Sequence, residues 1–228
     1  MIEKWRQPFI DFGLRTGLLY VCQRILARIP LSPVPVKYFL VAQPVPPPPR
    51  KIRPHSLRIE QIDADDYQID WFPRPAPFIA ARYEQNAKCF VAFSDDHPLA
   101  CLWLKTAGDY TEDTVRCRFR PEPQAHTAWD FDVYVQPEHR LGRTFMHLWN
   151  HAFEWMRERD IHWTMSRIDA FNLPSINAHK RLGAQFTGSV VFWTWGRWQL
   201  ALASQTPRFS LSRQAMPIYT VSAPERTD

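Results

Sequence analysis

Residues 133–145 read VYVQPEHRLGRTF and carry the clearest structural signal in the chain. The pattern predicts a strand that stops at Pro137, then a short basic loop with Arg140, Gly142 and Arg143, then an apolar helix. The first N–H groups of a helix lack partners within it, and the helix dipole is positive at that end. We therefore expect this strand, loop and helix to bind the phosphate of a cofactor, with the two arginines adding positive charge.

The composition fits one domain of ordinary size with extensions. The chain has 228 residues, 45% of them apolar and ten of them tryptophan, which is enough for a substantial core. Its net charge of +5 comes from 28 basic and 23 acidic residues that are spread along the sequence. This mild excess favours an anionic ligand, whereas a nucleic-acid-binding protein would present a denser basic face. We expect no nucleic acid partner.

The cysteines and histidines form no metal-binding pattern. No two cysteines make a CxxC pair, and three of the four lie inside strand-like apolar runs. We interpret all four as reduced thiols of a cytoplasmic protein. His147 and His151 are spaced to share a metal ion on one helix face, but no third ligand accompanies them. We therefore expect no metal.

A proline run divides the chain. Residues 44–49, PVPPPP, cannot form a helix or a central strand and are interpreted as an extended spacer. We therefore separate an N-terminal helix and linker, residues 1–50, from the main domain, residues 51–205. From about residue 206 the chain is polar and dotted with prolines. Residues 206–228 are therefore expected to form a loose or draped tail.

Residues 9–29 are interpreted as an amphipathic helix. Its apolar residues share one face: Leu14, Leu18, Val21, Cys22, Ile25 and Ile29. Charged residues interrupt the segment, whereas a membrane-spanning helix needs about 20 mostly uncharged residues. Two alternatives remain open. The helix packs on the body of the protein, or it lies on a membrane surface or against a partner, where its arginines would suit anionic lipid.

The order of the predicted elements indicates the fold class. Helices are predicted at residues 76–85, from Gly142 to about Arg159, and from Pro174 to Gly183. Strands are predicted at residues 57–62, 89–93, 99–104, 114–119, 128–135, 162–170, 185–195 and 197–203. Antiparallel strands come first, and a strand–helix–strand–helix–strand series follows. This order predicts an α+β domain with a mixed, mostly antiparallel sheet and helices on both faces.

Two segments together resemble the GNAT superfamily of acyl-CoA-dependent acyltransferases. The first is VYVQPEHRLGRTF, which resembles the family's strand, loop and helix that hold the coenzyme A pyrophosphate. The second is NLPSINAHKRLGA, residues 172–184, where Asn172, Ser175, His179 and Gly183 occupy the motif positions. The resemblance covers roughly residues 57–203. It implies a GNAT-like sheet and an acyl-CoA co-substrate, acetyl-CoA or another acyl-CoA.

The resemblance also implies which residues hold the cofactor. Val133, Tyr134 and Val135 would bind the acyl-pantetheine arm through their backbone, with one N–H facing the thioester oxygen. The pyrophosphate would bind at Arg140, Leu141, Gly142, Arg143, Thr144 and Phe145, and Asn172 and Ser175 would come from the second motif. Such a strand needs an exposed backbone edge, so it should splay from the strand at residues 162–170 and contain a bulge. The sequence departs from the family at Arg143 and Phe145, where glycines are usual.

The catalytic candidates are two carboxylates and a histidine. Asp130 and Asp132 share one strand face with Tyr134 in a regular strand, and one of the two would suit a general base. The alternative is a cross-strand ion-pair ladder with Arg116 and Arg118.

The second motif also leaves roles open. His179 stands where the family has a tyrosine, which makes it a candidate proton donor; otherwise it is a helix-surface histidine and solvent supplies the proton. Asn172 either contacts the pantetheine arm or caps the helix, and Ser175 is otherwise a residue of the first helical turn.

The sequence therefore predicts an enzyme that transfers an acetyl or longer acyl group from coenzyme A to an amine in a ternary complex. One rival is acyl transfer from an acyl carrier protein to a lipid or glycan precursor, with the N-terminal helix contacting the carrier or the inner face of the membrane. Another rival is a non-catalytic module that binds acyl-CoA. The predicted location is the cytoplasm.

Overall fold

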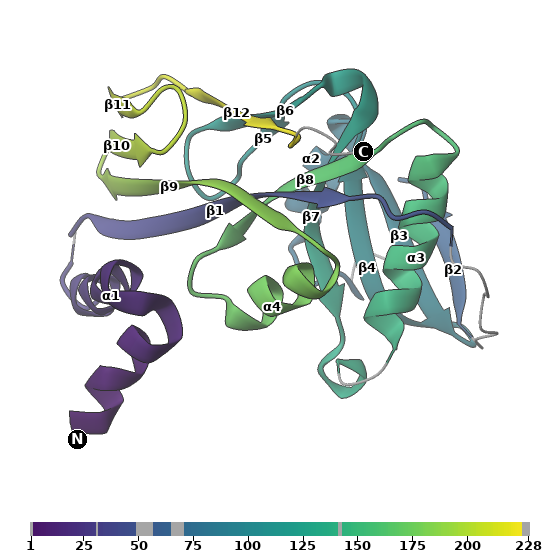
Figure 1. Cartoon of the computed structure of the whole chain (residues 1–228), viewed down its shortest axis with the longest axis horizontal. Helices are drawn as coiled ribbons and strands as arrows, with labels where there is room; N and C mark the ends of the chain where they lie inside the picture. Colours follow the sequence, from purple (N-terminus) through teal and green to yellow (C-terminus); the bar gives the residue numbers. More distant parts are fainter. Residues whose placement is uncertain (1, 31, 49–56, 65–70, 141–142, 225–228) are drawn as a thin grey trace. The chain divides into compact units, whose positions relative to one another are not determined.

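The computed structural model describes residues 2–30, 32–48, 57–64, 71–140 and 143–224. The chain divides into two compact units. The first unit contains residues 1–43, 109–122 and 165–228, and the second contains residues 44–108 and 123–164. Figure 1 follows the chain through both units.

The first unit contains two helices and most of the strands. Its helices are α1 (Ile2–Leu26) and α4 (Leu173–Arg181). Its strands are β1 (Val34–Pro44), β5 (Tyr110–Thr111), β6 (Arg118–Glu122), β8 (Trp163–Asp169), β9 (Gln185–Trp195), β10 (Trp198–Ala203), β11 (Phe209–Ser212) and β12 (Ile218–Ser222). The first two residues of β8 belong to the second unit.

A large sheet and a small one form the core of the first unit. The large sheet has the order β11-β10-β9-β1-β8, and β9 pairs antiparallel with both β1 and β10. The small sheet has the order β12-β6-β5, in which β12 and β6 are parallel. It covers one face of the large sheet, because Tyr219 packs against Phe192 of β9. On the other face, Ile176 of α4 packs with Val41 and Ile168.

The second unit has helices on both faces of a four-stranded sheet, as the sequence predicts. Its strands are β2 (Arg58–Ile62), β3 (Lys88–Ser94), β4 (His97–Lys105) and β7 (Thr127–Val135), in the antiparallel order β7-β4-β3-β2. Tyr83 of α2 (Ala76–Glu84) packs on Trp103 at one face. His151 and Trp155 of α3 (Thr144–Arg157) pack on Phe90 at the other.

The structure places two segments inside the first unit that the sequence analysis puts outside the main domain. Strand β1 lies within residues 1–50, and it pairs with β9 from Val34 to Ala42. Prolines near both of its ends hide this strand in the sequence, although Pro35 lies near its start, where a missing N–H is tolerated best. Beyond β1, Val45 is buried and donates its N–H to the His162 carbonyl, 2.9 Å away, so the proline run is anchored at its start.

The predicted tail likewise contains ordered strands. Strand β11 pairs with β10, and β12 pairs with β6. Tyr219 and Val221 of β12 are fully buried and contribute to the core. Residues 209–222 are therefore part of the folded unit. Their short alternating runs are hard to recognise because turn-forming residues surround them.

The N-terminal helix α1 bends sharply at Gly13. Gly13 has φ +71°, a backbone conformation in the left-handed region that favours glycine. The segment before it folds back on the segment after it at Gly17, where an added Cβ would lie 2.8 Å from the Pro8 carbonyl oxygen. Among the described residues, no helix is long and apolar enough to cross a bilayer.

Candidate functional site

Strand β7 contains a bulge in the stretch that the sequence analysis singles out. Along β4, Trp103 pairs with Phe131 and Cys101 pairs with Tyr134, so Asp132 and Val133 together stand opposite Leu102. Asp132 has φ +46°, which bends the strand at this point. The expected bulge is therefore present, and it lies directly before the predicted pantetheine-binding residues.

The bulge changes which side chains share a face. Asp130 pairs with Leu104, the neighbour of Trp103, so it lies on the sheet face opposite to the Trp103 ring. Asp132 instead reaches Arg82 of α2, whose guanidinium lies over the rings of Trp103 and Phe131. The prediction that Asp130 and Asp132 share one face is wrong, because strict alternation does not survive a bulge.

Asp130 is a buried residue that is 2% exposed. One of its carboxylate oxygens accepts a hydrogen bond from Thr164 Oγ1 at 2.7 Å. Thr164 is itself fully buried at the start of β8. A polar pair enclosed in this way holds strand positions together, because each buried group satisfies the other.

Asp132 forms the centre of a second polar group. Its carboxylate pairs with the buried Arg82 and lies 3.4 Å from an Nη atom of Arg74. The side chain of Asp132 is 16% exposed and that of Arg74 is 38% exposed. A buried guanidinium requires a counter-charge, and Asp132 supplies it on a strand whose end borders the predicted cofactor loop.

The predicted ladder with Arg116 and Arg118 has different partners. Arg118 lies on β6, whose neighbours in its sheet are β12 and β5. It pairs with Asp109 at 3.6 Å, while Arg116 donates to the Arg197 carbonyl at 2.8 Å. Strands that follow one another in the sequence, such as β6 and β7, need not be neighbours in a sheet.

The loop after β7 begins with a 3₁₀ turn at Pro137–His139. Gln136 anchors it, because its N–H donates to the Leu99 carbonyl and its Nε2 donates to the Pro98 carbonyl, both at 2.9 Å. Arg140 folds back, and its Nε donates to the Val135 carbonyl at 3.0 Å. Leu141 and Gly142 lie outside the described residues.

Helix α3 begins after this loop with a positive terminus. Arg143 occupies the N-cap position, and Thr144 opens the helix as a buried residue. The first turn contains no acidic side chain. Phe145 packs 6.3 Å from the Trp149 ring, which begins the buried face predicted from the sequence. The amide groups of this turn and the two arginines therefore offer favourable charge for an anion.

The second motif forms the start and the body of α4. Asn172 caps the helix, since its Oδ1 accepts the N–H of Ser175 at 3.2 Å, and Ser175 is a residue of the first turn. His179 is 5% exposed, and its Nδ1 lies 3.1 Å from Oε1 of the fully buried Gln43. His179 is therefore not a helix-surface histidine; it joins α4 to the end of β1.

The first unit also contains a buried ion pair that the sequence analysis missed. Arg167 makes two bonds to Glu112, at 2.8 and 2.9 Å. The Tyr38 hydroxyl lies 3.5 Å from Glu112, and the Thr114 N–H donates to the same carboxylate at 3.2 Å. Burial, together with the negative charge of Glu112, raises the pKa of Tyr38. In the sequence, only Arg167 inside an apolar strand indicates such a pair. It does not identify Glu112, which is 55 positions away.

One group of described residues has the donor atoms for a metal ion. The Asp160 carboxylate lies 3.1 Å from His126 Nδ1 and 2.8 Å from His162 Nε2. The two imidazole rings stack with 5.1 Å between their centroids. This group arises in the second unit from residues that precede β7 and β8, so it was not visible as a sequence motif.

Comparison with known proteins gives the family. The model of the Acetyltransferase (GNAT) family matches residues 56–184, more than half of the chain. A search of curated proteins finds none that matches significantly.

Solved structures with a similar fold include a GNAT-family protein from Novosphingobium aromaticivorans, with a TM-score of 0.46 and 15% identity over 69% of this chain and 62% of that one. The tandem GNAT protein of clavulanic acid biosynthesis has a TM-score of 0.48 and 17% identity over 71% and 53%. The yncA protein of Salmonella typhimurium, solved with acetyl-CoA, has a TM-score of 0.39 and 16% identity over 57% and 79%.

The chain thus spans little more than half the length of the first two structures. The family match includes both the bulged strand β7 with its loop and the α4 motif. The chain belongs to the GNAT acetyltransferase family.

Proposed function

We propose that this protein is an acyltransferase that moves an acetyl or longer acyl group from coenzyme A to an amine acceptor in a ternary complex. The observation that carries the proposal is the bulge at Asp132–Val133, near the end of β7, which leads at Val135 into the loop before α3. A bulge leaves backbone groups outside the regular ladder. Family membership supplies the chemistry for which such a strand is suited.

The acyl-pantetheine arm binds along Val133, Tyr134 and Val135, with a backbone N–H directed at the thioester oxygen. The pyrophosphate binds at the first turn of α3, where Thr144 and Phe145 contribute backbone N–H groups. Arg140 and Arg143 flank this turn and add positive charge. At the second motif Asn172 serves as a helix cap, which positions α4.

The reaction joins the acceptor nitrogen to the acyl carbon and breaks the carbon–sulfur bond. The nitrogen loses one proton and the departing thiolate gains one, so the transfer needs a neutral amine held in line with the thioester. Asp132 is the carboxylate nearest to this part of β7, but two guanidiniums stabilise its ionised form and weaken it as a base. We assign Asp132 to binding the acceptor as an ammonium cation in exchange for Arg74, whose side chain is 38% exposed. The bound ammonium gives one proton to solvent and so becomes the neutral amine that attacks the thioester.

The other two candidates have supporting roles. Asp130 holds Thr164 at the start of β8, away from the face that contains Arg82. His179 makes its contact with Gln43 inside the first unit. Both contacts favour a structural role for Asp130 and His179. We therefore propose that solvent accepts the proton of the amine and donates the proton to the thiolate.

The cofactor assignment is tested by the thermal stability of the protein with acetyl-CoA, a long-chain acyl-CoA and free coenzyme A. A ligand that binds the native state raises the melting temperature, and the rank of the three gives the preferred donor. Arg143→Glu should weaken binding about tenfold or more, because it reverses a charge at the anion site. Arg159→Glu, beyond the other end of α3, is the matched control.

Two outcomes would defeat the assignment. One is that neither acetyl-CoA, nor the long-chain acyl-CoA, nor free coenzyme A raises the melting temperature. The other is equal weakening by Arg143→Glu and Arg159→Glu, which would show a general effect of charge. Release of free thiol with a panel of amines then tests turnover as distinct from binding.

A further inference from the structure

The apolar face of α1 points outward in the first unit. Leu14 is 77% exposed, Leu18 56% and Ile25 46%, and Ile29 just beyond the helix is 52% exposed. Ile10, on the segment before the bend, is 71% exposed. These five residues, the α1 stripe, include four of the five most exposed large apolar side chains among the described residues. Single exposed apolar residues are common on protein surfaces. Several that follow one another along a helix form a contiguous apolar surface, which is typical of an interaction site.

The opposite face of α1 is the one that packs. Thr16 is 7% exposed and accepts a hydrogen bond from Lys37 Nζ at 2.7 Å. Gln23 Nε2 donates to the Pro35 carbonyl at 3.0 Å. The Tyr20 ring meets the Phe171 ring at 5.2 Å. The amphipathic helix is thus attached through its more polar side, which leaves the α1 stripe uncovered within the described residues.

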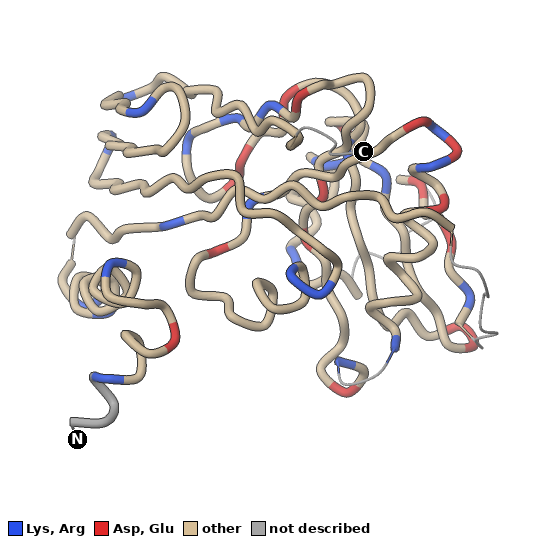
Figure 2. Tube along the Cα trace, viewed as in Figure 1, with Lys and Arg blue, Asp and Glu red and all other residues tan. Residues whose placement is uncertain are grey.

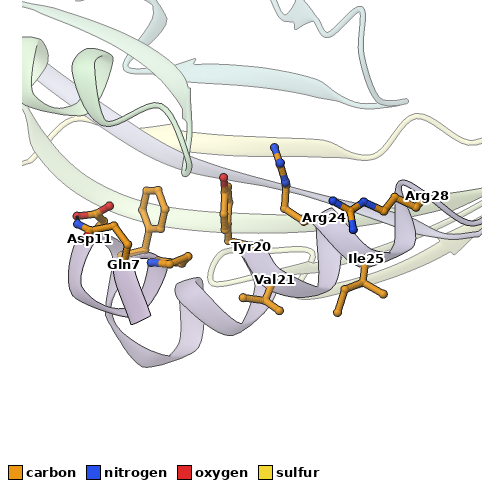
Figure 3. A pocket seen from close by; sticks show the side chains of 9 residues that line it. Gln7, Asp11, Tyr20, Val21, Arg24, Ile25 and Arg28 are labelled. Atoms are coloured by element: carbon orange, nitrogen blue, oxygen red, sulfur yellow. Dashed lines mark hydrogen bonds between the residues drawn. The ribbon is translucent and has the colours of Figure 1, made fainter. Parts of the chain in front are cut away.

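Figure 3 shows this division from close by: Val21 and Ile25 project from one side of the helix, while Tyr20 and Arg24 project from the other. The segments before and after Gly13 line a pocket of about 420 Å³ that is open to solvent on one side. Pro8, Val21 and Ile25 line it along with Arg24 and Arg28. An apolar surface therefore adjoins two cationic side chains.

The charge around the α1 stripe has one predominant sign. At the helical period, exposed Arg15 flanks the stripe on one side and exposed Arg28 flanks it on the other, while exposed Arg24 lies farther round the helix. Residues 6–30 contain four arginines and a single acidic residue, Asp11. Figure 2 shows basic positions along α1. Asp11 already accepts a hydrogen bond from Gln7 at 2.7 Å.

We propose that α1 docks this protein on the surface of an anionic phospholipid bilayer. The α1 stripe enters the boundary between headgroups and acyl chains, and the flanking arginines contact phosphates. A second copy of the chain is disfavoured as the occupant, because a two-fold contact between stripes would bring like-charged arginines together. The proposal concerns a surface of the first unit and stands independently of the acyl-transfer reaction.

Vesicle flotation of the full chain tests the proposal. The protein should float with vesicles that contain phosphatidylglycerol and remain largely unbound with phosphatidylcholine alone, and salt should weaken binding. Leu14→Glu/Leu18→Glu should reduce the bound fraction about tenfold, since it places charge in the stripe. The matched control is Leu202→Glu/Leu211→Glu, at positions that are 44% and 50% exposed on β10 and β11. Thermal unfolding confirms that each variant is folded.

A third variant, Arg15→Gln/Arg24→Gln/Arg28→Gln, isolates the charge term and should abolish the preference for phosphatidylglycerol. The proposal is overturned if the parent protein stays with the unbound fraction in both lipids. Equal loss of binding in the stripe and control variants would also overturn it, because that result indicates general adsorption. So would a dimer that does not float and that Leu14→Glu/Leu18→Glu dissociates, as measured by light scattering.

Discussion

Each of the two units contains an arginine paired with a carboxylate, and the two carboxylates differ in how completely they are enclosed. In the first unit, Arg167 and Glu112 meet through two bonds, and the Glu112 side chain is 0% exposed. In the second, Asp132 is 16% exposed and shares its carboxylate between buried Arg82 and the more exposed Arg74. Glu112 is fully occupied by partners within its own unit, whereas under the proposed function an acceptor replaces Arg74 at Asp132.

The difference has a structural cause. Glu112 receives additional bonds from Tyr38 and from the Thr114 N–H, so its oxygens have little room for another partner. Asp132 is located at a bulge, where the strand leaves its regular ladder and directs the side chain toward α2. We therefore expect the fully enclosed carboxylate to stabilise the fold and the partly exposed one beside the bulge to serve the proposed binding of the acceptor.

The largest expected effect is on the enclosed pair. Glu112→Ala should lower the free energy of unfolding by about 3–5 kcal/mol, because it leaves the Arg167 guanidinium, which is only 16% exposed, without its counter-charge. Urea unfolding followed by circular dichroism measures the change. The double variant Glu112→Leu/Arg167→Met should recover most of the loss, since an apolar pair carries no desolvation cost. If Glu112→Ala is as stable as the parent protein, the pair of Glu112 and Arg167 does not stabilise the fold.

The second prediction compares the two ion pairs through their effect on catalytic activity. Asp132→Asn should reduce kcat/KM about 100-fold, near 2.7 kcal/mol of transition-state stabilisation, because the amide no longer attracts a cationic acceptor. Its unfolding free energy should fall less than that of Glu112→Ala, since the asparagine amide oxygen can still accept a hydrogen bond from the buried Arg82. Arg74→Gln should leave stability within about 0.5 kcal/mol, as expected for an exposed ion pair, and change KM alone. Equal kcat/KM in Asp132→Asn and the parent would remove the distinction between the pairs.

The effect that is smallest near neutral pH concerns a thiol beside each pair. Burial raises the pKa of Cys101, next to Asp132, to about 12, although Arg82 opposes the shift. Burial and Glu112 likewise raise the pKa of Cys117, while Arg167 opposes that shift. Each thiol stays protonated in the folded chain while the unfolded chain ionises. The contribution of Cys101 to the free energy of unfolding is therefore fully present below pH 9.0, the ordinary pKa of the thiol, and is lost as the pH rises toward 12.

This loss has a slope of at most about 1.4 kcal/mol per pH unit for each thiol. Unfolding free energies across that pH range measure it. Cys101→Ala should make the decline shallower, and Cys22→Ala is the control, because Cys22 is only partly buried. An unchanged slope in Cys101→Ala would assign the alkaline loss to other groups, such as Tyr38 and Tyr219, whose pKa values burial also raises.

Much of the second unit was predictable from the sequence. The hairpin of β3 and β4, the short helix α2 and the long helix α3 follow local periodicity, and their limits agree with the predicted ones within a few residues. In the first unit, β1 was missed because prolines frame it, and β12 because its partner strand is about 100 residues earlier in the chain. Short strands gain their stability from pairing, and pairing is not a local property.

In the candidate site, too, some features were predictable from the sequence and others were not. Local pattern was sufficient for the strand, the basic loop and the helix that follows, because turn residues and apolar spacing act over a few positions. It could not assign the side of the sheet for Asp130 and Asp132, since one extra residue in a strand reverses every later side chain. The partners of these carboxylates, Thr164, Arg74 and Arg82, are 34 to 58 positions away.

Periodicity alone also recognised the amphipathic character of α1, since that is a property of the spacing of its own residues. Which face of α1 packs was decided by contacts with Lys37, Pro35 and Phe171, and these contacts selected the more polar face. Spacing along a chain defines a helix and its faces; the neighbours that the fold brings to it determine which face remains available to bind.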